Sequence, residues 1–243
     1  MNENHNPSAS APHSIHLLLY HQVGDTPHAN TNLDCFCRTI DFYSQMEFLS
    51  NSSYQVISLS KATELISSQN PLDADYVVLT FDDGCERFYD ITFPILESFG
   101  FPSAIYPVAN YLGKCATWGN VMNRELRILS KSQLMELAGL QVEIGAHTMD
   151  HVKLTSVSED DAIVQVLESK KILEQLIGRE IRSFAYPHGA YTRETIDIVR
   201  EAGFSNALTC VARAAGAAES MYEIPRKYIT YYDDLNAFKQ KLL

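Results

Sequence analysis

Between Tyr76 and Gly84 the chain reads YVVLTFDDG, an apolar run that is followed at once by two carboxylates and a glycine. A short apolar run bounded by polar residues predicts a buried strand over 76–81. Asp82 and Asp83 leave the end of that strand, and Gly84 permits the tight turn that follows. On its own an Asp-Asp-Gly sequence is usually a surface turn. Its meaning therefore depends on the rest of the chain.

Three other predicted strands end in the same way. The strand predicted over 15–20 leads into His21, and the one over 142–146 leads into the pair His147 and His151. The strand predicted over 181–186 leads into a Pro-His-Gly sequence that contains His188. In a parallel α/β barrel the carboxyl ends of the strands face one side, which holds the active site. We therefore expect these four segments to converge.

Helical patterns alternate with the strands, which predicts parallel βαβ units. Helices are expected over 33–49, 60–67, 87–99, 130–137, 158–178, 193–202 and 233–242, and further strands over 54–59, 102–108, 206–210 and 223–229. The expected fold class is α/β, a single (β/α) barrel of about seven parallel strands, near the typical length of ~250 residues. Residues 1–14 are expected to form a disordered tail, and residues 15–243 one catalytic domain.

Composition excludes several classes of protein. The 243 residues include 19 basic and 30 acidic ones, a formal charge of −11, and no basic cluster suited to nucleic acid. No apolar run reaches the ~18 residues of a transmembrane helix. The start of the chain lacks the features of a secretory signal, so we expect a cytoplasmic protein, or an extracytoplasmic one if a leader was removed. The five cysteines are expected to be reduced.

The histidines and carboxylates match the chemistry of a metal site. His147 and His151 are spaced i, i+4, so a helical turn would place them on one face. Two imidazoles and one carboxylate form the usual catalytic zinc site with an open position. Either Asp82 or Asp83 can supply that carboxylate, and the other can take a proton from water.

These segments resemble the motifs of the polysaccharide deacetylase family. LTFDDG at 79–84 is similar to its first motif, HTMDH at 147–151 to its second, and FAYPHG at 184–189 to its third. LYH at 19–21 and IPR at 224–226 are similar to the poly-N-acetylglucosamine deacetylase branch. The resemblance implies a distorted (β/α) barrel, and a metal-dependent hydrolase that removes N-acetyl groups from a sugar or glycan.

The resemblance also implies roles for individual residues. Asp83, His147 and His151 would hold a divalent metal, with zinc as the expected ion. Asp82 would be the general base that takes a proton from the attacking water. The metal would polarise the acetyl carbonyl.

Two departures from the family pattern affect the remaining roles. The C-terminal Leu-x-His motif that supplies the acid in many members is absent, so His21 is expected to protonate the leaving amine. Ala185 stands where many members carry an Arg that steadies the base, and Arg226 is the expected replacement. His188 stands where the family usually has Tyr. Its backbone N–H is expected to stabilise the oxyanion, and its ring is a second candidate for the acid.

The expected partner is an N-acetylated sugar, and nothing in the sequence specifies an oligomeric state. Two alternatives are a hydrolase of a non-sugar amide or imide on the same fold, and a carbohydrate-binding protein with a degenerate site. The segments 24–32 and 111–129 are candidate rims of the substrate site. Trp118 lies in the second of them and can either stack on a sugar ring or belong to the core.

Overall fold

The computed structural model describes five stretches of the chain, residues 13–27, 31–118, 126–140, 142–216 and 220–243. Most of the tail expected over residues 1–14 lies outside them. Within them, no helix combines the length and the apolar character that crossing a membrane requires.

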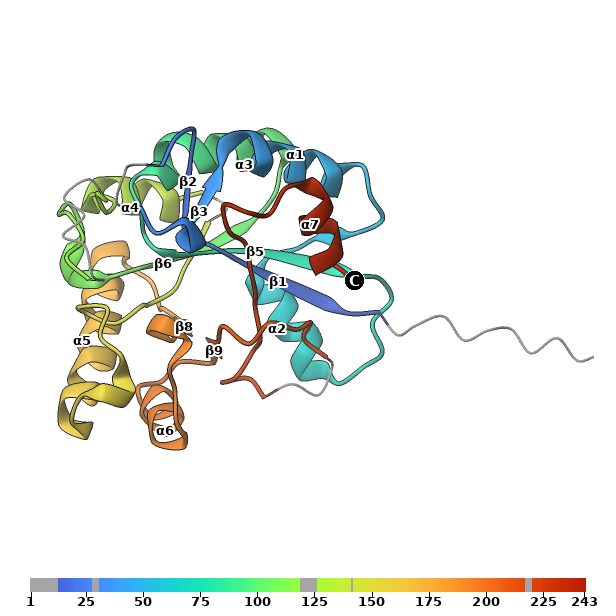
Figure 1. The fold of residues 1–243 in the computed structure, drawn as a ribbon. Helices are drawn as coiled ribbons and strands as arrows, with labels where there is room; N and C mark the ends of the chain where they lie inside the picture. Colours follow the sequence, from blue (N-terminus) through green and yellow to red (C-terminus); the bar gives the residue numbers. More distant parts are fainter. Residues whose placement is uncertain (1–12, 28–30, 119–125, 141, 217–219) are drawn as a thin grey trace, which may run out of the picture.

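A parallel sheet forms the centre of the molecule (Figure 1). Its strands run in the order β10-β1-β5-β6-β7, and β4 pairs with the first residues of β5. Their bounds are β1 Ile15–Tyr20, β4 Gln55–Val56, β5 Tyr76–Asp83, β6 Ser103–Pro107, β7 Val142–Ile144 and β10 Lys227–Tyr228. The α/β class with parallel strands is therefore confirmed.

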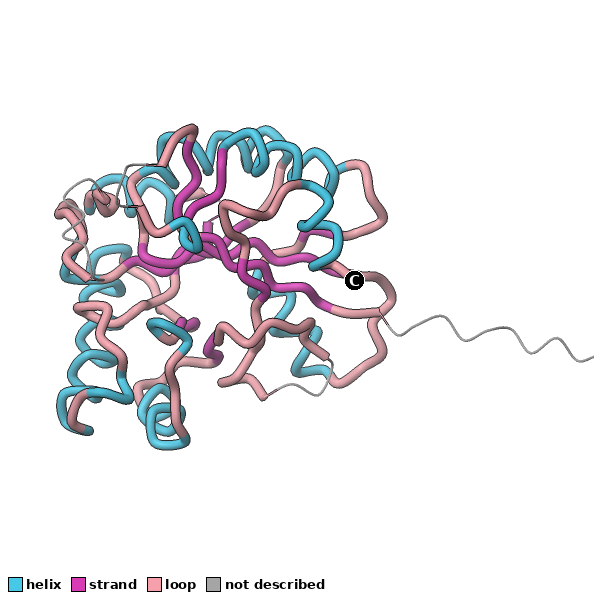
Figure 2. The backbone as a smooth tube through the Cα atoms, in the orientation of Figure 1, coloured by secondary structure: helices cyan, strands magenta, loops and turns pink. Residues whose placement is uncertain are grey.

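The remaining strands form two separate parallel pairs (Figure 2). These are β2 (Gln22–Gly24) with β3 (Phe36–Arg38), and β8 (Ser183–Ala185) with β9 (Asn206–Leu208). Single parallel bridges from Ala146 to Phe184 and from Leu208 to Ile224 link β8 and β9 to the sheet. The described strands thus form one sheet and two pairs, and a closed barrel of seven strands is not confirmed.

Seven α-helices surround the strands in the described part of the chain. Figure 1 shows α1, α3 and α7 above the sheet, α2 below it, and α5 and α6 beside β8 and β9. Their bounds are α1 Thr39–Ser50, α2 Leu59–Ser68, α3 Phe93–Phe99, α4 Lys131–Ala138, α5 Glu159–Ile177, α6 Arg193–Glu201 and α7 Leu235–Lys241. Ser130 and Gln133 form a capping box at α4, and Ser158 and Gly178 cap the two ends of α5.

Several predicted elements were too long, and in three of them the structure shows the reason. The helix expected over 33–49 begins only at Thr39, because Phe36–Arg38 pairs with β2 as a strand. The helix expected over 87–99 starts with a π-helical turn, Phe88–Thr92, just before Pro94, whose ring nitrogen donates no hydrogen bond. The strand expected over 223–229 shrinks to β10, since Pro225 interrupts the ladder between Ile224 and Lys227.

Strand β5 explains why the two aspartates diverge. All eight of its residues are buried, and two apolar clusters take alternate ones: the first takes Val77, Leu79 and Phe81, and the second takes Tyr76 and Val78. Side chains alternate between the faces of a strand. Asp82 therefore continues the face of Val78 and Thr80. At Asp83 the backbone turns into the left-handed region, with a φ of 71°, and the strand ends.

Candidate active site

The structure brings Asp83, His147 and His151 together in a buried cluster. Their candidate ligand atoms all lie within 4.8 Å of one another. Oδ1 of Asp83 is 3.2 Å from Nε2 of His151 and 3.7 Å from Nε2 of His147. Tetrahedral ligands at about 2.1 Å from a zinc ion would be about 3.4 Å apart. The observed spacing therefore fits one such ion.

The hydrogen bonds of this cluster leave the same atoms open. Nδ1–H of His147 donates to the carbonyl oxygen of Ala185 at 2.8 Å, which fixes the ring and leaves the Nε2 lone pair facing Asp83. Within the described residues, the buried Oδ1 of Asp83 accepts no hydrogen bond. Buried polar atoms are rarely without a partner. The residues present thus fit a bound cation.

The backbone that carries the two histidines is not the helical turn that their spacing suggested. Thr148 and His151 have φ values of 65° and 58°, in the left-handed region. The hydroxyl of Thr148 accepts the N–H of His151 at 2.9 Å and closes a tight loop. The two rings still approach, with centroids 4.9 Å apart. The two histidines come together as predicted, but the helical turn that was expected to bring them together is not present.

Asp82 lies beside this cluster in a buried ion pair with Arg226. Its two carboxylate oxygens each accept an N–H of the guanidinium at 2.7 Å. The guanidinium also donates to the carbonyl of Thr209 at 2.9 Å and to the hydroxyl of Thr80 at 3.3 Å. Both charged side chains are almost fully buried. Arg226 therefore lies where the sequence placed it, against Asp82.

The pair controls the charge of Asp82. Burial alone would raise the pKa of this carboxyl group, but the charge of Arg226 and its hydrogen bonds outweigh burial and hold the pKa below its usual value. Burial lowers the pKa of His147 to about 4. Asp82 is thus an ionised carboxylate at neutral pH, and His147 is a neutral imidazole that can bind a metal.

His21 lies at the end of β1, close to both carboxylates. Burial lowers its pKa, but Cys35 and the carboxylates of Asp83 and Asp82 outweigh burial and raise it to about 9. The hydroxyl of Tyr228 lies 3.1 Å from Nε2 of His21 and 3.4 Å from the sulfur of Cys35. A pKa raised in this way favours the protonated imidazolium of His21 at neutral pH.

Sequence reasoning did not find Tyr228. A signal for it was available, because Arg226 and Tyr228 are two residues apart in an extended segment. Side chains at that spacing share one face. A tyrosine beside the predicted Arg226 was therefore a candidate for the same site.

The rings of His188 and Trp118 both lie next to His151 of the metal cluster. The ring of His188 is 4.5 Å from that of His151, and the ring of Trp118 is 4.7 Å from it. His188 is exposed and has a φ of 59°, whereas Trp118 is half-buried. Burial and the neighbouring His151 lower the pKa of His188, so its ring is less suited than His21 to carry a proton.

A cavity of about 670 Å³ lies elsewhere, at the amino-terminal ends of β6 to β9. Active sites of parallel barrels lie at the opposite, carboxyl ends of the strands, where the predicted residues are. The cavity is therefore separate from the candidate site. Its lining includes Tyr106, Glu143, Arg182, Ser183 and Asn206.

Solved deacetylases share this fold. The Streptococcus pyogenes deacetylase PplD, solved in complex with acetate, matches with a TM-score of 0.82 and 22% identity, over 96% of this chain and all of that one. IcaB from Ammonifex degensii matches with a TM-score of 0.81 and 22% identity, over 95% of this chain and 96% of that one. At this identity the likeness establishes the deacetylase fold.

The family follows from the sequence comparison. A family model described as "Polysaccharide deacetylase" matches residues 69–207, more than half of the chain. The chain therefore belongs to the polysaccharide deacetylase family, and the resemblance is confirmed. It is 27% identical to the poly-beta-1,6-N-acetyl-D-glucosamine N-deacetylase of Escherichia coli K12, over 85% of this chain but only 35% of that protein. The chain thus spans about a third of that relative. His21 and Arg226 lie outside the matched segment.

Proposed function

We propose that this protein is a metal-dependent hydrolase that removes N-acetyl groups from an N-acetylated sugar or glycan. The observation that carries the proposal is the open Oδ1 of Asp83, which faces Nε2 of His147 and of His151 in a buried cluster. Membership of the polysaccharide deacetylase family supports an acetylated sugar as the substrate. The name of the Escherichia coli relative supports an N-acetyl group.

The catalytic domain in this proposal comprises residues 15–243. We further propose that its strands follow the distorted barrel that the resemblance implies. The bridges from Ala146 to Phe184 and from Leu208 to Ile224 support this arrangement, because they link β8 and β9 to β7 and to the segment before β10.

Asp83, His147 and His151 would hold the metal, with zinc as the proposed ion. When bound, a divalent ion would supply Lewis acidity to the acetyl carbonyl and to the attacking water. The neutral His147, with its Nδ1–H held by the carbonyl of Ala185, is the form that binds a cation. The overall charge of −11 suits a neutral or cationic substrate better than a polyanion.

Asp82 would accept a proton from the attacking water. Each carboxylate oxygen has two lone pairs. The two contacts to Arg226 occupy one on each oxygen, which leaves one on each for the water. The guanidinium also fixes the orientation of the carboxylate, so the base is positioned before the substrate binds.

The leaving amine needs a proton, because an amide nitrogen leaves poorly as an anion. His21 would donate it, since its raised pKa keeps the imidazolium populated at neutral pH. The backbone N–H of His188 would stabilise the negative charge that develops on the acetyl oxygen. Water thus adds to the carbonyl carbon, the C–N bond breaks, and acetate and a free amine result.

The test is acetate release from N-acetylglucosamine oligomers and from N-acetylated monosaccharide derivatives, with and without added zinc. Asp82→Asn is the control, because it keeps the size of the side chain and removes the base. We expect zinc-dependent acetate that is lost in the variant. Zinc binding without acetate from any sugar would favour a non-sugar amide or imide. Absence of both would favour a carbohydrate-binding protein.

A further inference from the structure

The loop between the two histidines of the metal cluster adopts a backbone conformation that it would not adopt alone. Thr148 and His151 have left-handed φ values, which residues with a Cβ atom seldom adopt. Such conformations persist where the surrounding structure over-determines them. The groups that hold this loop therefore help to position both histidines.

One of these groups is the side-chain amide of Gln165, which comes from helix α5. Its Oε1 accepts the backbone N–H of Met149 at 3.1 Å and that of Asp150 at 3.0 Å. Its Nε2 donates to Oδ2 of Asp150 at 2.7 Å. This one amide thus holds both backbone N–H groups and the carboxylate of the two residues between Thr148 and His151.

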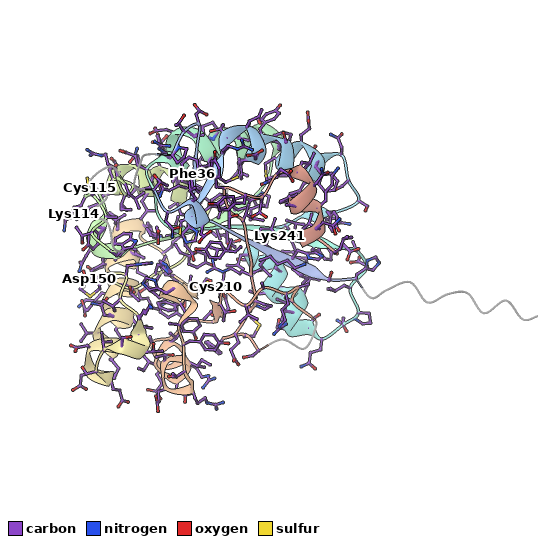
Figure 3. All side chains as sticks on the ribbon, viewed as in Figure 1. Phe36, Lys114, Cys115, Asp150, Cys210 and Lys241 are labelled. Carbon is purple, nitrogen blue, oxygen red and sulfur yellow. The ribbon has the colours of Figure 1, made fainter. Side chains whose placement is uncertain are left out.

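The other side of the loop is held by the turn at Ala109–Tyr111. Nδ2 of Asn110 donates to Oδ1 of Asp150 at 2.8 Å, and its backbone N–H donates to the carbonyl of Met149 at 3.0 Å. The carboxylate of Asp150, labelled in Figure 3, therefore lies between the amides of Asn110 and Gln165. It is found on the same side of the molecule as α5.

We propose that Gln165 is a positioning residue for the metal site, acting with Asp150 and Asn110 to hold His147 and His151 in place before an ion binds. This inference rests on the proposed function in assigning a metal to those histidines. Glutamine suits the task because one planar amide offers both an acceptor and donors. A glutamate would offer the carboxylate of Asp150 no donor.

The test compares the same substitution at two positions of α5. Gln165→Met keeps the length and helix propensity of the side chain but removes the amide. Gln175→Met is the matched control, because Gln175 is exposed on the same helix. Zinc affinity is measured by competition with a chromophoric chelator. We expect Gln165→Met to weaken it roughly 10–100-fold, as is typical when the support of a metal ligand is lost. Gln175→Met should leave it unchanged.

Thermal unfolding of the metal-free proteins distinguishes positioning from simple stability. If Gln165→Met lowers the melting temperature but binds zinc as tightly as the wild type, the inference is overturned. Gln165→Glu, which keeps both acceptor contacts and loses the donor, should give an intermediate affinity, and an affinity equal to wild type would also contradict us. Zinc binding by the wild type without acetate release would refute the proposed reaction while the affinity comparison still decides the role of Gln165. A wild type that binds no zinc would refute both.

Discussion

Replacing Arg226 by Met would remove the positive charge that faces Asp82. The pair joins two nearly fully buried groups through two contacts of 2.7 Å, so its loss would leave a buried carboxylate without its cationic partner. Breaking a buried pair in this way costs about 3–5 kcal/mol. Since each kcal/mol lowers Tm by about 2–4 °C in chains of 150–250 residues, we expect Tm to decrease by roughly 6–20 °C.

The substitution should also change how stability depends on pH. In the wild type the lowered pKa of Asp82 contributes stability above the unfolded carboxyl pKa of about 3.9, and this contribution is lost as the pH falls through the folded value. Without Arg226, burial would raise the folded pKa instead. The variant would then bind a proton on folding, and this part of its stability would decrease as the pH rises. Its activity, by contrast, would recover as the pH rises, because the base must be ionised.

The assay is thermal unfolding at pH 5 and pH 8 for the wild type, Arg226→Met, and the double variant Asp82→Asn/Arg226→Met. The double variant carries no unpaired charge, so it should be more stable than Arg226→Met at pH 8. The reasoning would be refuted if Arg226→Met lost less than about 1 kcal/mol, the value of a solvent-exposed pair, and the double variant were no more stable.

Three further predictions concern the neighbouring groups. His188→Gly keeps the backbone N–H and suits the positive φ of this residue, so kcat should change little. His21→Ala should lower kcat roughly 10²–10⁴-fold. An equally large loss in His188→Gly would make the ring of His188 the acid. Tyr228→Phe removes the hydroxyl beside Nε2 of His21, so kcat/KM should decrease by less than in His21→Ala. The alkaline limb of the pH profile of kcat/KM should also shift in Tyr228→Phe. An unchanged profile would contradict this. Zinc at 100 times its Kd should stabilise the wild type by about 2.7 kcal/mol in urea unfolding, and Asp83→Ala should remove that gain; equal stabilisation of both proteins would place the metal elsewhere.

The position of the site was predictable because it depends on strand ends. A buried strand can be recognised from its apolar run, and parallel strands align their carboxyl ends. His21 follows β1 directly, Asp82 and Asp83 end β5, and His147 follows β7 by three residues. No side-chain detail was needed for these placements, which is why the order of the segments along the chain was sufficient.

Other features depend on contacts between distant parts of the chain, and patterning along the sequence does not reveal those. Phe36–Arg38 lies within the 33–49 segment, which was expected to be helical, yet it forms a strand because β2 offers a pairing edge. Likewise the i, i+4 spacing of His147 and His151 suggested a helix, whereas the structure holds a left-handed loop. Gln165, which contacts that loop, has no signal of its own in the sequence. In each case tertiary contacts override local propensity.

Residue types alone left open which of the two adjacent aspartates would hold a metal, whereas the family resemblance assigned Asp83. The partners that each aspartate meets in the structure agree with that assignment. Both oxygens of Asp82 accept N–H groups from Arg226, and a cation bound there would be repelled by the guanidinium. Oδ1 of Asp83 faces two imidazole nitrogens instead. One aspartate thus meets a fixed positive charge, and the other, where the backbone leaves the strand with a φ of 71°, meets two imidazole nitrogens. The same residue type at adjacent positions is thereby suited to two tasks, proton transfer at Asp82 and metal binding at Asp83.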